Sequence, residues 1–354
     1  MSNTLFVGKV YHRFDELPST NDLAAKLVDL SEVSSPLKGL EGTAKTKPPE
    51  GTVVRAANQT AGRGQLGSKW HSSSGDNLLL SIIFYPTWLE VQAQFYLSMA
   101  VALGVNDVIG SLGHLSLGHS SLGHSSLGHS SLGHSSLGRL SLGHSLLGRL
   151  SLGHSSLGHS SLGRLSLGRL SLGHLSLGRL SLGRLSLGHS SLGHLSLGRL
   201  SLGHSIKWPN DLYLGNKKTA GILIQNVLSG SNLQSSIVGI GLNANQLSFP
   251  PDLPNATSLA LTFGKTMDLD KIAERLFECL ERRYLQLKAG NRAAIKTEYE
   301  ENLWRRGERS CFVRSSENVE FEGIILGITE HGFLQVETKA GLEEFEVKQL
   351  RFVP

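Results

Sequence analysis

The run Gln59–Gly67 combines three glycines with Arg63, and this combination suits an anionic ligand. Glycines let the backbone come close to a ligand and turn its N–H groups towards anionic oxygens. The arginine adds a fixed positive charge that can bind a carboxylate or phosphate through two hydrogen bonds. The run lacks the Gly-Lys-Ser/Thr ending of a Walker loop and the spacing of a dinucleotide fingerprint. Alone, it predicts an anion site no more strongly than an ordinary glycine-rich surface turn.

Four other blocks carry residues of the same chemical kind. They are Ser-Thr-Asn at 19–21, Lys-Trp-Pro-Asn-Asp at 207–211, Lys-Lys-Thr-Ala-Gly-Ile-Leu at 217–223 and Gly-Ile-Gly-Leu-Asn at 239–243. Together with the glycine-rich run, and in this order, they resemble the signature of the catalytic domain of biotin protein ligases. The resemblance covers essentially the whole chain outside a repeat at 111–205.

This resemblance implies a reaction in two steps. The carboxylate of biotin attacks the α-phosphate of ATP, giving biotinyl-5′-AMP and pyrophosphate, and a lysine of a carrier protein then displaces AMP. Such a reaction needs no nucleophile from the enzyme, so it rests on positioning two anions and neutralising phosphoryl charge. The implied substrates are ATP and biotin with Mg²⁺, and the implied partner is the biotin carboxyl-carrier protein of acetyl-CoA carboxylase.

The resemblance also implies roles for particular residues. The catalytic cations would be Arg63, Lys207 and Lys218. The biotin-binding residues would be Ser19, Thr20, Asn21, Gln59, Arg63, Gly64, Gln65, Ser81 and Lys218. The ATP-binding residues would be Arg63, Trp70, Lys207, Asn210 and Asn243. Asp211 would either help to hold Mg²⁺ or orient a lysine.

Several of these residues also have plain structural interpretations. Ser19 could serve as a helix N-cap, because Ser is among the preferred residues there. Trp70 and Trp208 could be core aromatic residues, and Asn77 could cap a strand turn. Many family members carry further arginines in the glycine-rich loop, where this chain has Gln65 and Ser68. These two departures remove positive charge that could help to retain the adenylate.

Strands and helices must position these residues. Apolar residues recur at every second position in the predicted strands and at every third or fourth position in the predicted helices. We expect helices to begin near Ser19–Asp22 and to cover 89–109 and 268–287. We expect strands at 5–14, 52–57, 78–85 and 236–242, with a hairpin over 212–227. This order predicts an α+β fold, a mixed sheet with packed helices of the biotin/lipoate ligase type.

The C-terminal part has a different texture. From about Gly307 short alternating runs such as VEFEGIILGI and EEFEVKQLRFV follow one another, which is typical of a small β-barrel. We therefore divide the chain into a catalytic domain at 1–110 and 206–305, a repeat insert at 111–205 and an SH3-like domain at 306–354.

The insert repeats the unit Ser-Leu-Gly-His/Arg-Ser/Leu 19 times, broken only by Leu146. Glycine in every unit weakens any helix, and one or two leucines per unit offer little apolar surface to offset chain entropy. We expect a poorly ordered, long low-complexity insert. A regular coil like the pentapeptide-repeat solenoids and metal capture by the histidines are the alternatives.

Charge and composition exclude several classes of function. The net charge of +5 comes from the insert, which holds 7 arginines and no acidic residue, while the remainder has 27 basic and 29 acidic residues. The charge therefore does not support a nucleic-acid partner, and we expect no DNA-binding domain ahead of Leu5. The sequence has no run of about 18 apolar residues, so it predicts no membrane span. Two cysteines suit a reducing compartment, so we expect a cytoplasmic protein.

Two rival functions stay open. A lipoate-type protein ligase would share the fold, although the Gly-Arg-Gly and Lys-Trp-Pro-Asn-Asp blocks favour biotin. A non-catalytic biotin or adenylate sensor, or a scaffold built around the repeat, would need neither Arg63 nor Lys218, and both are present.

Overall fold

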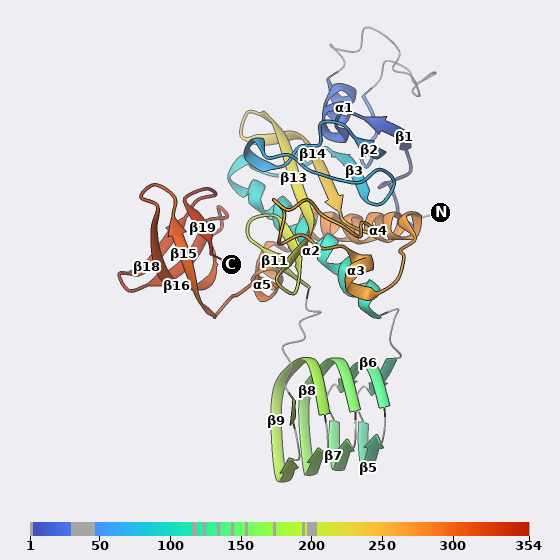
Figure 1. The fold of residues 1–354 in the computed structure, drawn as a ribbon, viewed down its shortest axis with the longest axis vertical. Coiled ribbons are helices and arrows are strands. Elements are labelled where there is room, and N and C mark those ends of the chain that lie inside the picture. The colour runs from blue at the N-terminus through green and yellow to red at the C-terminus, as the bar shows by residue number, and fades with distance from the viewer. Residues whose placement is uncertain are drawn as a thin grey trace. The chain divides into compact units, whose positions relative to one another are not determined.

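The computed structural model describes residues 3–29, 47–114 and 204–353, together with the paired strands of the repeat. Residues 31–51, rich in Ser, Pro, Gly and Lys, are typical of a loop, and most of them lie outside the described residues. The chain separates into two compact units, one made of 1–108 with 205–354 and the other of 109–204 (Figure 1).

A mixed seven-stranded sheet forms the centre of the first unit, with strand order β1-β2-β3-β14-β13-β12-β11. Its strands are β1 (Tyr11–Leu17), β2 (Val53–Gln59), β3 (Leu78–Phe84), β11 (His204–Lys207), β12 (Asp211–Leu214), β13 (Lys217–Ser229) and β14 (Asn232–Leu242). Strands β1 and β2 run parallel, whereas the β2–β3, β3–β14, β14–β13 and β13–β12 pairs are antiparallel. The predicted α+β fold with a mixed sheet is confirmed.

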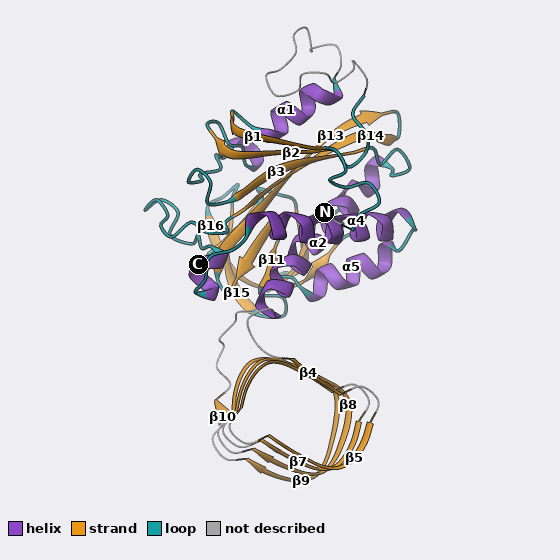
Figure 2. Ribbon diagram, turned by 90° about the vertical axis from the view of Figure 1, so that its right-hand side faces the viewer, coloured by secondary structure: helices purple, strands orange, loops and turns teal. Residues whose placement is uncertain are grey.

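Helices cover both faces of this sheet. They are α1 (Thr20–Val28), α2 (Gln94–His114), α3 (Leu259–Phe263), α4 (Leu269–Lys288) and α5 (Arg292–Glu301), with short 3-10 turns at Gln65–Gly67 and Val91–Ala93. Helix α1 lies on one face, and α2, α4 and α5 lie on the other (Figure 2). Because β3 is covered from both sides, all seven of its residues are buried, which explains its almost continuous apolar sequence.

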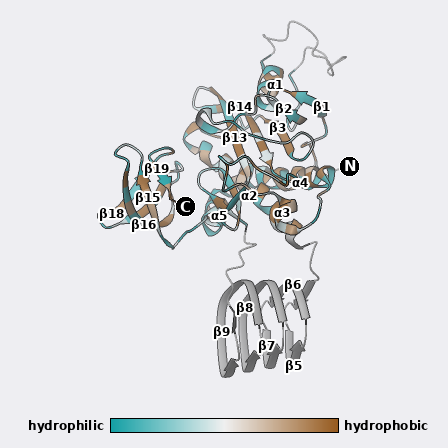
Figure 3. Cartoon of the chain, in the orientation of Figure 1, coloured by the Kyte–Doolittle hydropathy of each residue, from teal (hydrophilic) through white to brown (hydrophobic). Residues whose placement is uncertain are grey.

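The apolar residues gather in these layers, as the colouring of β3 and β14 in Figure 3 shows. One helical stretch, Val91–Leu112, is long and apolar enough to cross a membrane by length and composition. Since 72% of its most apolar window is buried within the protein, it serves as a core helix. On the opposite face, Leu23 and Ala24 of α1 pack against Val54, Ile83 and Ile237.

The N-terminal strand differs from the prediction. We expected residues 5–14 to be extended, but β1 begins at Tyr11. The backbone N–H groups of Leu5, Phe6 and Val7 instead donate to the Glu281 carboxylate of α4 at 2.6, 2.7 and 3.0 Å. This tertiary contact satisfies donors that a strand would have paired with a neighbour.

The C-terminal residues form a separate five-stranded antiparallel sheet of order β18-β17-β16-β15-β19. Its strands are β15 (Arg309–Arg314), β16 (Val319–Ile328), β17 (Leu334–Thr338), β18 (Gly341–Phe345) and β19 (Leu350–Phe352). Phe312, Ile325, Ile328 and Val336 are buried in its core. The predicted small β domain is confirmed.

The repeat forms parallel strands in the second unit, namely β4 (His119–Leu122), β5 (Ser125–Leu132), β6 (Ser135–Leu142), β7 (Ser145–Leu152), β8 (Ser155–Leu172), β9 (Leu175–Leu192) and β10 (Leu195–Ser196). Paired residues of these strands lie 20 positions apart, as in His119↔Arg139 and Ser155↔Leu175. The register therefore spans four five-residue units. A regular register of this kind is a feature of the coil that was the alternative to the poorly ordered insert.

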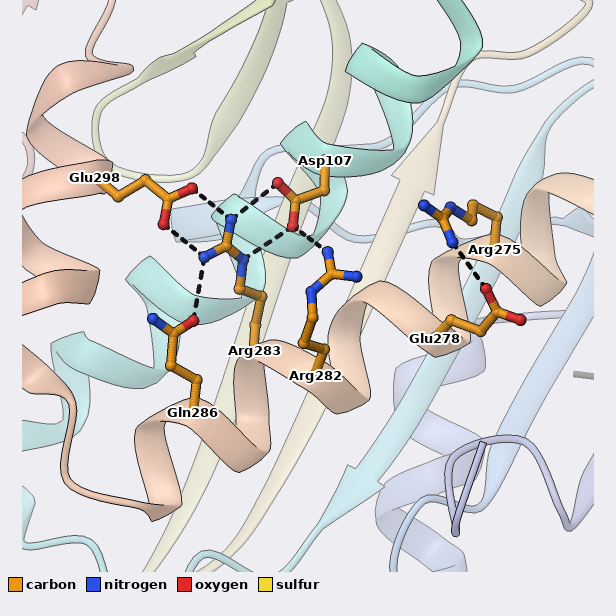
Figure 4. Close-up of polar contacts among 7 residues, drawn as sticks. All are labelled: Asp107, Arg275, Glu278, Arg282, Arg283, Gln286 and Glu298. Atoms are coloured by element: carbon orange, nitrogen blue, oxygen red, sulfur yellow. Dashed lines mark hydrogen bonds and ion pairs between the residues drawn. The ribbon is translucent and has the colours of Figure 1, made fainter. Parts of the chain in front are cut away.

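The two segments of the chain that flank the insert are anchored to the same part of the first unit. Asp107 near the end of α2 accepts hydrogen bonds from Arg282 and Arg283 of α4, and Arg283 also binds Glu298 of α5 (Figure 4). On the other side of the insert, the Ile206 N–H donates to the carbonyl of Asn302 at 2.8 Å, just beyond α5. Helix α5 and the residue after its end thus hold both roots of the insert.

Candidate active site

A cavity of about 230 Å³ opens between the start of α1, the loop after β2 and strands β12 to β14. Its lining brings together most of the residues that the sequence blocks predicted for the site. Those that line it are Ser19, Thr20, Asn21, Gln59, Arg63, Gly64, Gln65, Trp70, Asn210, Asp211 and Lys218. Ser81, Lys207 and Asn243 do not.

One end of the cavity is neutral and polar. Ser19 caps α1, its hydroxyl accepting from the Asp22 N–H at 3.3 Å, so that Thr20 and Asn21 begin the helix beside the cavity. The Thr20 N–H donates to Gln59 Oε1 at 2.7 Å, and the Asn21 amide donates to Gln225 Oε1 at 3.0 Å. Because these side chains bind one another, their donors and acceptors are already oriented.

Ser81 supports this polar end from behind. It is the polar residue within the otherwise apolar strand β3, and it is fully buried. Its hydroxyl lies 2.8 Å from Thr20 Oγ1 and donates to Asn21 Oδ1 at 2.6 Å. We predicted Ser81 in the biotin-binding set, and the structure places it behind the residues that line the cavity.

Two glycines of β14 explain the Gly-Ile-Gly-Leu-Asn block. Gly239 lies opposite Ser81 in the sheet, and a Cβ at Gly239 would collide with the Asn21 amide. Gly241 lies opposite Gly221 of β13, and a Cβ at either position would press into the Trp70 indole, at 2.5 and 2.9 Å. The missing side chains therefore make room for Asn21 and provide a flat backbone surface under Trp70.

The glycine-rich run folds back on itself as a compact loop. The Trp70 N–H donates to the Gly62 carbonyl at 3.0 Å, and the Gly64 N–H donates to the Ser68 carbonyl at 2.7 Å. Arg63 at the cavity edge forms an ion pair with Asp22 of α1 at 2.6 Å, with the two side chains 51% and 41% exposed. The loop therefore presents Arg63 beside the neutral polar end.

Lys218 provides the second cation of the cavity. Its ammonium lies 2.7 Å from the Asp211 carboxylate and 5.6 Å from the centre of the Trp70 ring. Its backbone is fixed by hydrogen bonds to the Asn255 carbonyl at 2.7 Å and from the Thr257 N–H at 2.8 Å. This contact is compatible with one of the two roles weighed for Asp211, that of orienting a lysine. Within the part of the chain that the structure describes, no three His, Cys, Asp or Glu residues group as metal ligands.

The two predicted asparagines differ in their placement. Asn210 lines the cavity, and its amide donates to the Ile222 carbonyl. Asn243, which we expected to face the nucleotide, is 4% exposed and donates to the Thr257 carbonyl at 3.1 Å. Its packing within the wall takes it out of the cavity lining, although its Oδ1 has no partner among the described residues.

Lys207 also lies outside the cavity lining, contrary to the expectation that it approaches the phosphates. Its ammonium is 3.1 Å from the Tyr213 hydroxyl and sits among the rings of Tyr213, Trp304 and Phe352, with centroids 5.2, 5.3 and 4.9 Å away. Burial lowers the pKa of Lys207, and the nearby Asp211 carboxylate opposes that shift. In this structure Lys207 joins the catalytic domain to β19 of the C-terminal sheet.

Trp208 and Asn77 have the structural roles that the sequence also allowed. Trp208 is buried and donates from its indole to the Gly332 carbonyl at 2.9 Å. The Asn77 amide spans a turn, accepting from the Ala244 N–H and donating to Ser72 and Gln246. Both residues hold segments together and do not line the cavity.

The predicted site residues leave out some of the lining, although residues 221–223 and 239–241 belong to the sequence blocks themselves. The missed residues are Ser68, Lys69, Leu80, Gly221, Ile222, Leu223, Gly239, Ile240 and Gly241. Gln225, which binds Asn21, was also missed. Period-two alternation in the strands could have indicated which of the Ile and Leu residues share a face, whereas the reach of Lys69 depends on the loop fold.

The cavity therefore offers two chemically different ends. One end presents neutral donors and acceptors in a fixed array with Arg63 beside it, and the other presents Lys218 next to the Trp70 ring. Such a site suits an elongated ligand with an uncharged polar group at one end and an anionic, aromatic group at the other.

Two family models and several known proteins match this chain. Residues 33–126 and 201–243 match the biotin/lipoate A/B protein ligase family, and residues 308–347 match the biotin protein ligase C-terminal domain. A bifunctional ligase/repressor BirA from Bacillus spizizenii is 24% identical over 328 residues, covering 92% of this chain and 73% of its own length.

One further relative and one solved structure are similar to this chain. A Paracoccus denitrificans protein named as a biotin–(acetyl-CoA-carboxylase) ligase is 31% identical over 155 residues, covering 42% of this chain and 62% of its own. The solved structure of an Aquifex aeolicus biotin protein ligase in complex with biotin and ATP superposes with a TM-score of 0.58 at 20% identity, covering 98% of this chain and 100% of that one. This superposition shows that the two chains share a fold.

Proposed function

The chain belongs to the biotin protein ligase family, and we propose that it is an ATP-dependent ligase that attaches biotin to a lysine of a carrier protein. In the first step a carboxylate oxygen of biotin attacks the α-phosphorus of ATP and pyrophosphate leaves, forming biotinyl-5′-AMP. In the second step the amine of the carrier lysine attacks the biotinyl carbonyl, loses a proton, and AMP leaves.

The cavity with one neutral end and one cationic end is the observation that carries this proposal. The reacting carboxylate and α-phosphate are both anions, so bringing them together costs Coulomb energy unless cations stand between them. Arg63 and Lys218 both line the cavity and have the charge for this task. The loop that carries Arg63 would also shield the reactive anhydride from water.

The neutral end suits the ureido ring of biotin. That ring presents two N–H donors and one carbonyl acceptor, so its pocket must offer both acceptors and donors. Ser19, Thr20, Asn21 and Gln59 line this end and provide hydroxyl and amide groups of both kinds. We propose that Ser81 contributes to binding by fixing Thr20 and Asn21.

The nucleotide would lie towards Trp70 and Asn210. The Trp70 indole rests on the backbone of Gly221 and Gly241, and its Nε1 has no partner among the described residues. A Mg²⁺ ion usually keeps several waters and is bound through substrate phosphates with one or two carboxylates, which fits a site whose acidic lining is Asp211. Its chemistry would be to offset phosphate charge; Lys218, Arg63 and the polar end do the binding and orienting.

The physiological acceptor follows from the family. We propose that the partner is a biotin carboxyl-carrier protein of acetyl-CoA carboxylase, in line with the name of the Paracoccus relative. We further propose that the chain acts in the cytoplasm, where such carriers and ATP are found together.

Transfer of labelled biotin to a purified carrier domain with ATP and Mg²⁺ tests the function. We expect ATP-dependent labelling by the wild type, with strong loss in Arg63→Ala and Lys218→Ala. Lipoate in place of biotin is the matched control, since a lipoate-type ligase would prefer it. Labelling with lipoate alone, or binding of biotin without any transfer, would overturn the proposal.

A further inference from the structure

Two of the cations that line the cavity, Arg63 and Lys218, are each held by one aspartate. Lys218 pairs with Asp211 at 2.7 Å, and Arg63 pairs with Asp22 at 2.6 Å. Asp211 lines the cavity itself, whereas Asp22 stands outside the lining, one residue after Asn21 on α1. Neither the sequence blocks nor the chemistry of the two steps assigns any role to Asp22.

Asp22 links two parts of the site, the first turn of α1 and the glycine-rich loop that carries Arg63. Asn21, its neighbour in the first turn of α1, lines the polar end and is fixed by Ser81 and Gln225. Arg63 lies on a loop whose own hydrogen bonds, such as that from the Gly64 N–H to the Ser68 carbonyl, close the loop on itself. The Arg63–Asp22 ion pair therefore connects the stem of the loop, where Arg63 lies opposite Lys69, to the helix that builds the polar end.

We infer that Asp22 is a positioning residue that tethers Arg63 at the mouth of the cavity. This inference rests on the proposed function and deepens it. The tether holds the guanidinium beside the first turn of α1, where the carboxylate end of a ligand seated on Ser19, Thr20 and Asn21 would meet it. Binding energy that would otherwise order the Arg63 side chain is then available for the reacting anions.

The exposure of the pair separates this role from a structural one. Both side chains are about half exposed, and an ion pair in that setting contributes little to the stability of a fold. Removing the charge of Asp22 should therefore leave the folded protein intact and change mainly where Arg63 lies. Asp22→Asn keeps the size of the side chain, and Asp22→Glu keeps the charge.

Asp270 offers a matched control. It forms ion pairs with Arg13 and Arg55 at 3.1 and 2.5 Å; its own side chain is 56% exposed, and none of these three residues lines the cavity. Asp270→Asn therefore removes one carboxylate charge from the first turn of a helix, as Asp22→Asn does, but at a carboxylate that is not paired with Arg63.

A double-mutant cycle on adenylate formation is the first test. We expect Asp22→Asn to lower kcat/KM for biotin about tenfold, because the guanidinium must be ordered during binding. Asp22→Glu should restore most of that loss, and Asp270→Asn should show none. In an Arg63→Ala background, Asp22→Asn should add no further loss, since the residue that it positions is gone. Wild-type kinetics for Asp22→Asn, or an equal loss in both backgrounds, would overturn the inference.

Trypsin cleavage after Arg63 provides a second test that does not depend on catalysis. We expect the peptide that begins at Gly64 to appear several-fold faster from Asp22→Asn than from wild type or Asp270→Asn, because an untethered arginine enters the protease site more readily. An unchanged cleavage rate would count against the tether. If wild type makes no biotinyl-5′-AMP, the proposed function fails, while the cleavage rates still decide whether Asp22 holds Arg63.

Discussion

The two ends of the cavity are built differently. At the polar end, Thr20, Asn21 and Ser81 are buried and bound to one another, so their geometry is fixed before any ligand arrives. Arg63, beside this array, and Lys218, at the cationic end, are 51% and 34% exposed, and each pairs with a single aspartate. Under the proposed function, a neutral ring would meet a rigid array, whereas the reacting anions would meet cations with exchangeable partners.

The largest effect should follow from removing the better fixed cation. We expect Lys218→Ala to lower the rate of biotinyl-5′-AMP formation at least about 100-fold, as is typical when a preorganised charge at a reacting group is lost. Lys218→Arg should restore little of it, because a planar guanidinium does not reproduce a compact ammonium between Asp211 and the Trp70 ring. Pyrophosphate release measures both. Full activity in Lys218→Ala would show that the cationic end is not where the reaction occurs.

Two alanine substitutions in β14 should separate the ends. Gly239→Ala would push on Asn21 and break its bond with Ser81, so we expect the Kd for biotin to rise by about 10 to 100-fold. Gly241→Ala would push on Trp70, so it should raise the KM for ATP more than the Kd for biotin. Calorimetry with biotin and steady-state kinetics with ATP measure the two effects. If both substitutions affected the two ligands equally, the division of the cavity into two ends would be wrong.

The sequence predicted the cavity well because its residues come from contiguous blocks. The residues at 19–21, 63–65, 210–211 and 218 lie at strand and helix ends, where local patterns place them correctly. Lys207 and Asn243 sit in such blocks too, yet the structure directs Lys207 to Phe352, 145 residues away, and buries Asn243 against Thr257. Contacts between distant segments decide such cases, and a single sequence does not show them.

The same limit applies to the fold. The spacing of apolar residues predicted most of the strands and helices. The segment at 5–10 instead bends towards Glu281, more than 270 residues away. The pairing of the repeat depends on a 20-residue register that spans four units, whereas the sequence shows a five-residue period alone.

A smaller effect is expected behind the polar end. Ser81→Ala should raise the Kd for biotin by about 3 to 10-fold, the usual cost of one buried hydrogen bond. Ser235→Ala on β14 is the matched control, because Ser235 is buried and its hydroxyl has no partner among the described residues. A change in biotin binding as large in Ser235→Ala as in Ser81→Ala would show that the effect comes from packing in the sheet and not from support of Thr20 and Asn21.

The smallest effect should come from deleting the repeat. Arg283 bridges Asp107 of α2 to Glu298 of α5, and the Asn302 carbonyl just after α5 accepts from the Ile206 N–H, so both ends of the insert are held near α5. Replacing 111–205 by a short Gly-Ser link should therefore leave kcat/KM within about threefold of the wild type, since loop-closure entropy changes slowly with length. Retention of the thermal midpoint, followed by circular dichroism, is the check on folding. Loss of folding or of biotin transfer would show that the insert is structural.

Formation of biotinyl-5′-AMP without any carrier protein tests the central claim most directly. Wild-type protein mixed with biotin, ATP and Mg²⁺ should release pyrophosphate only when biotin is present and should retain a compound with the mass of biotinyl-5′-AMP, and Lys218→Ala should produce neither signal. Biotin-independent pyrophosphate release, or equal adenylate formation in wild type and Lys218→Ala, would contradict the assignment of this cavity as the place where biotin and ATP react.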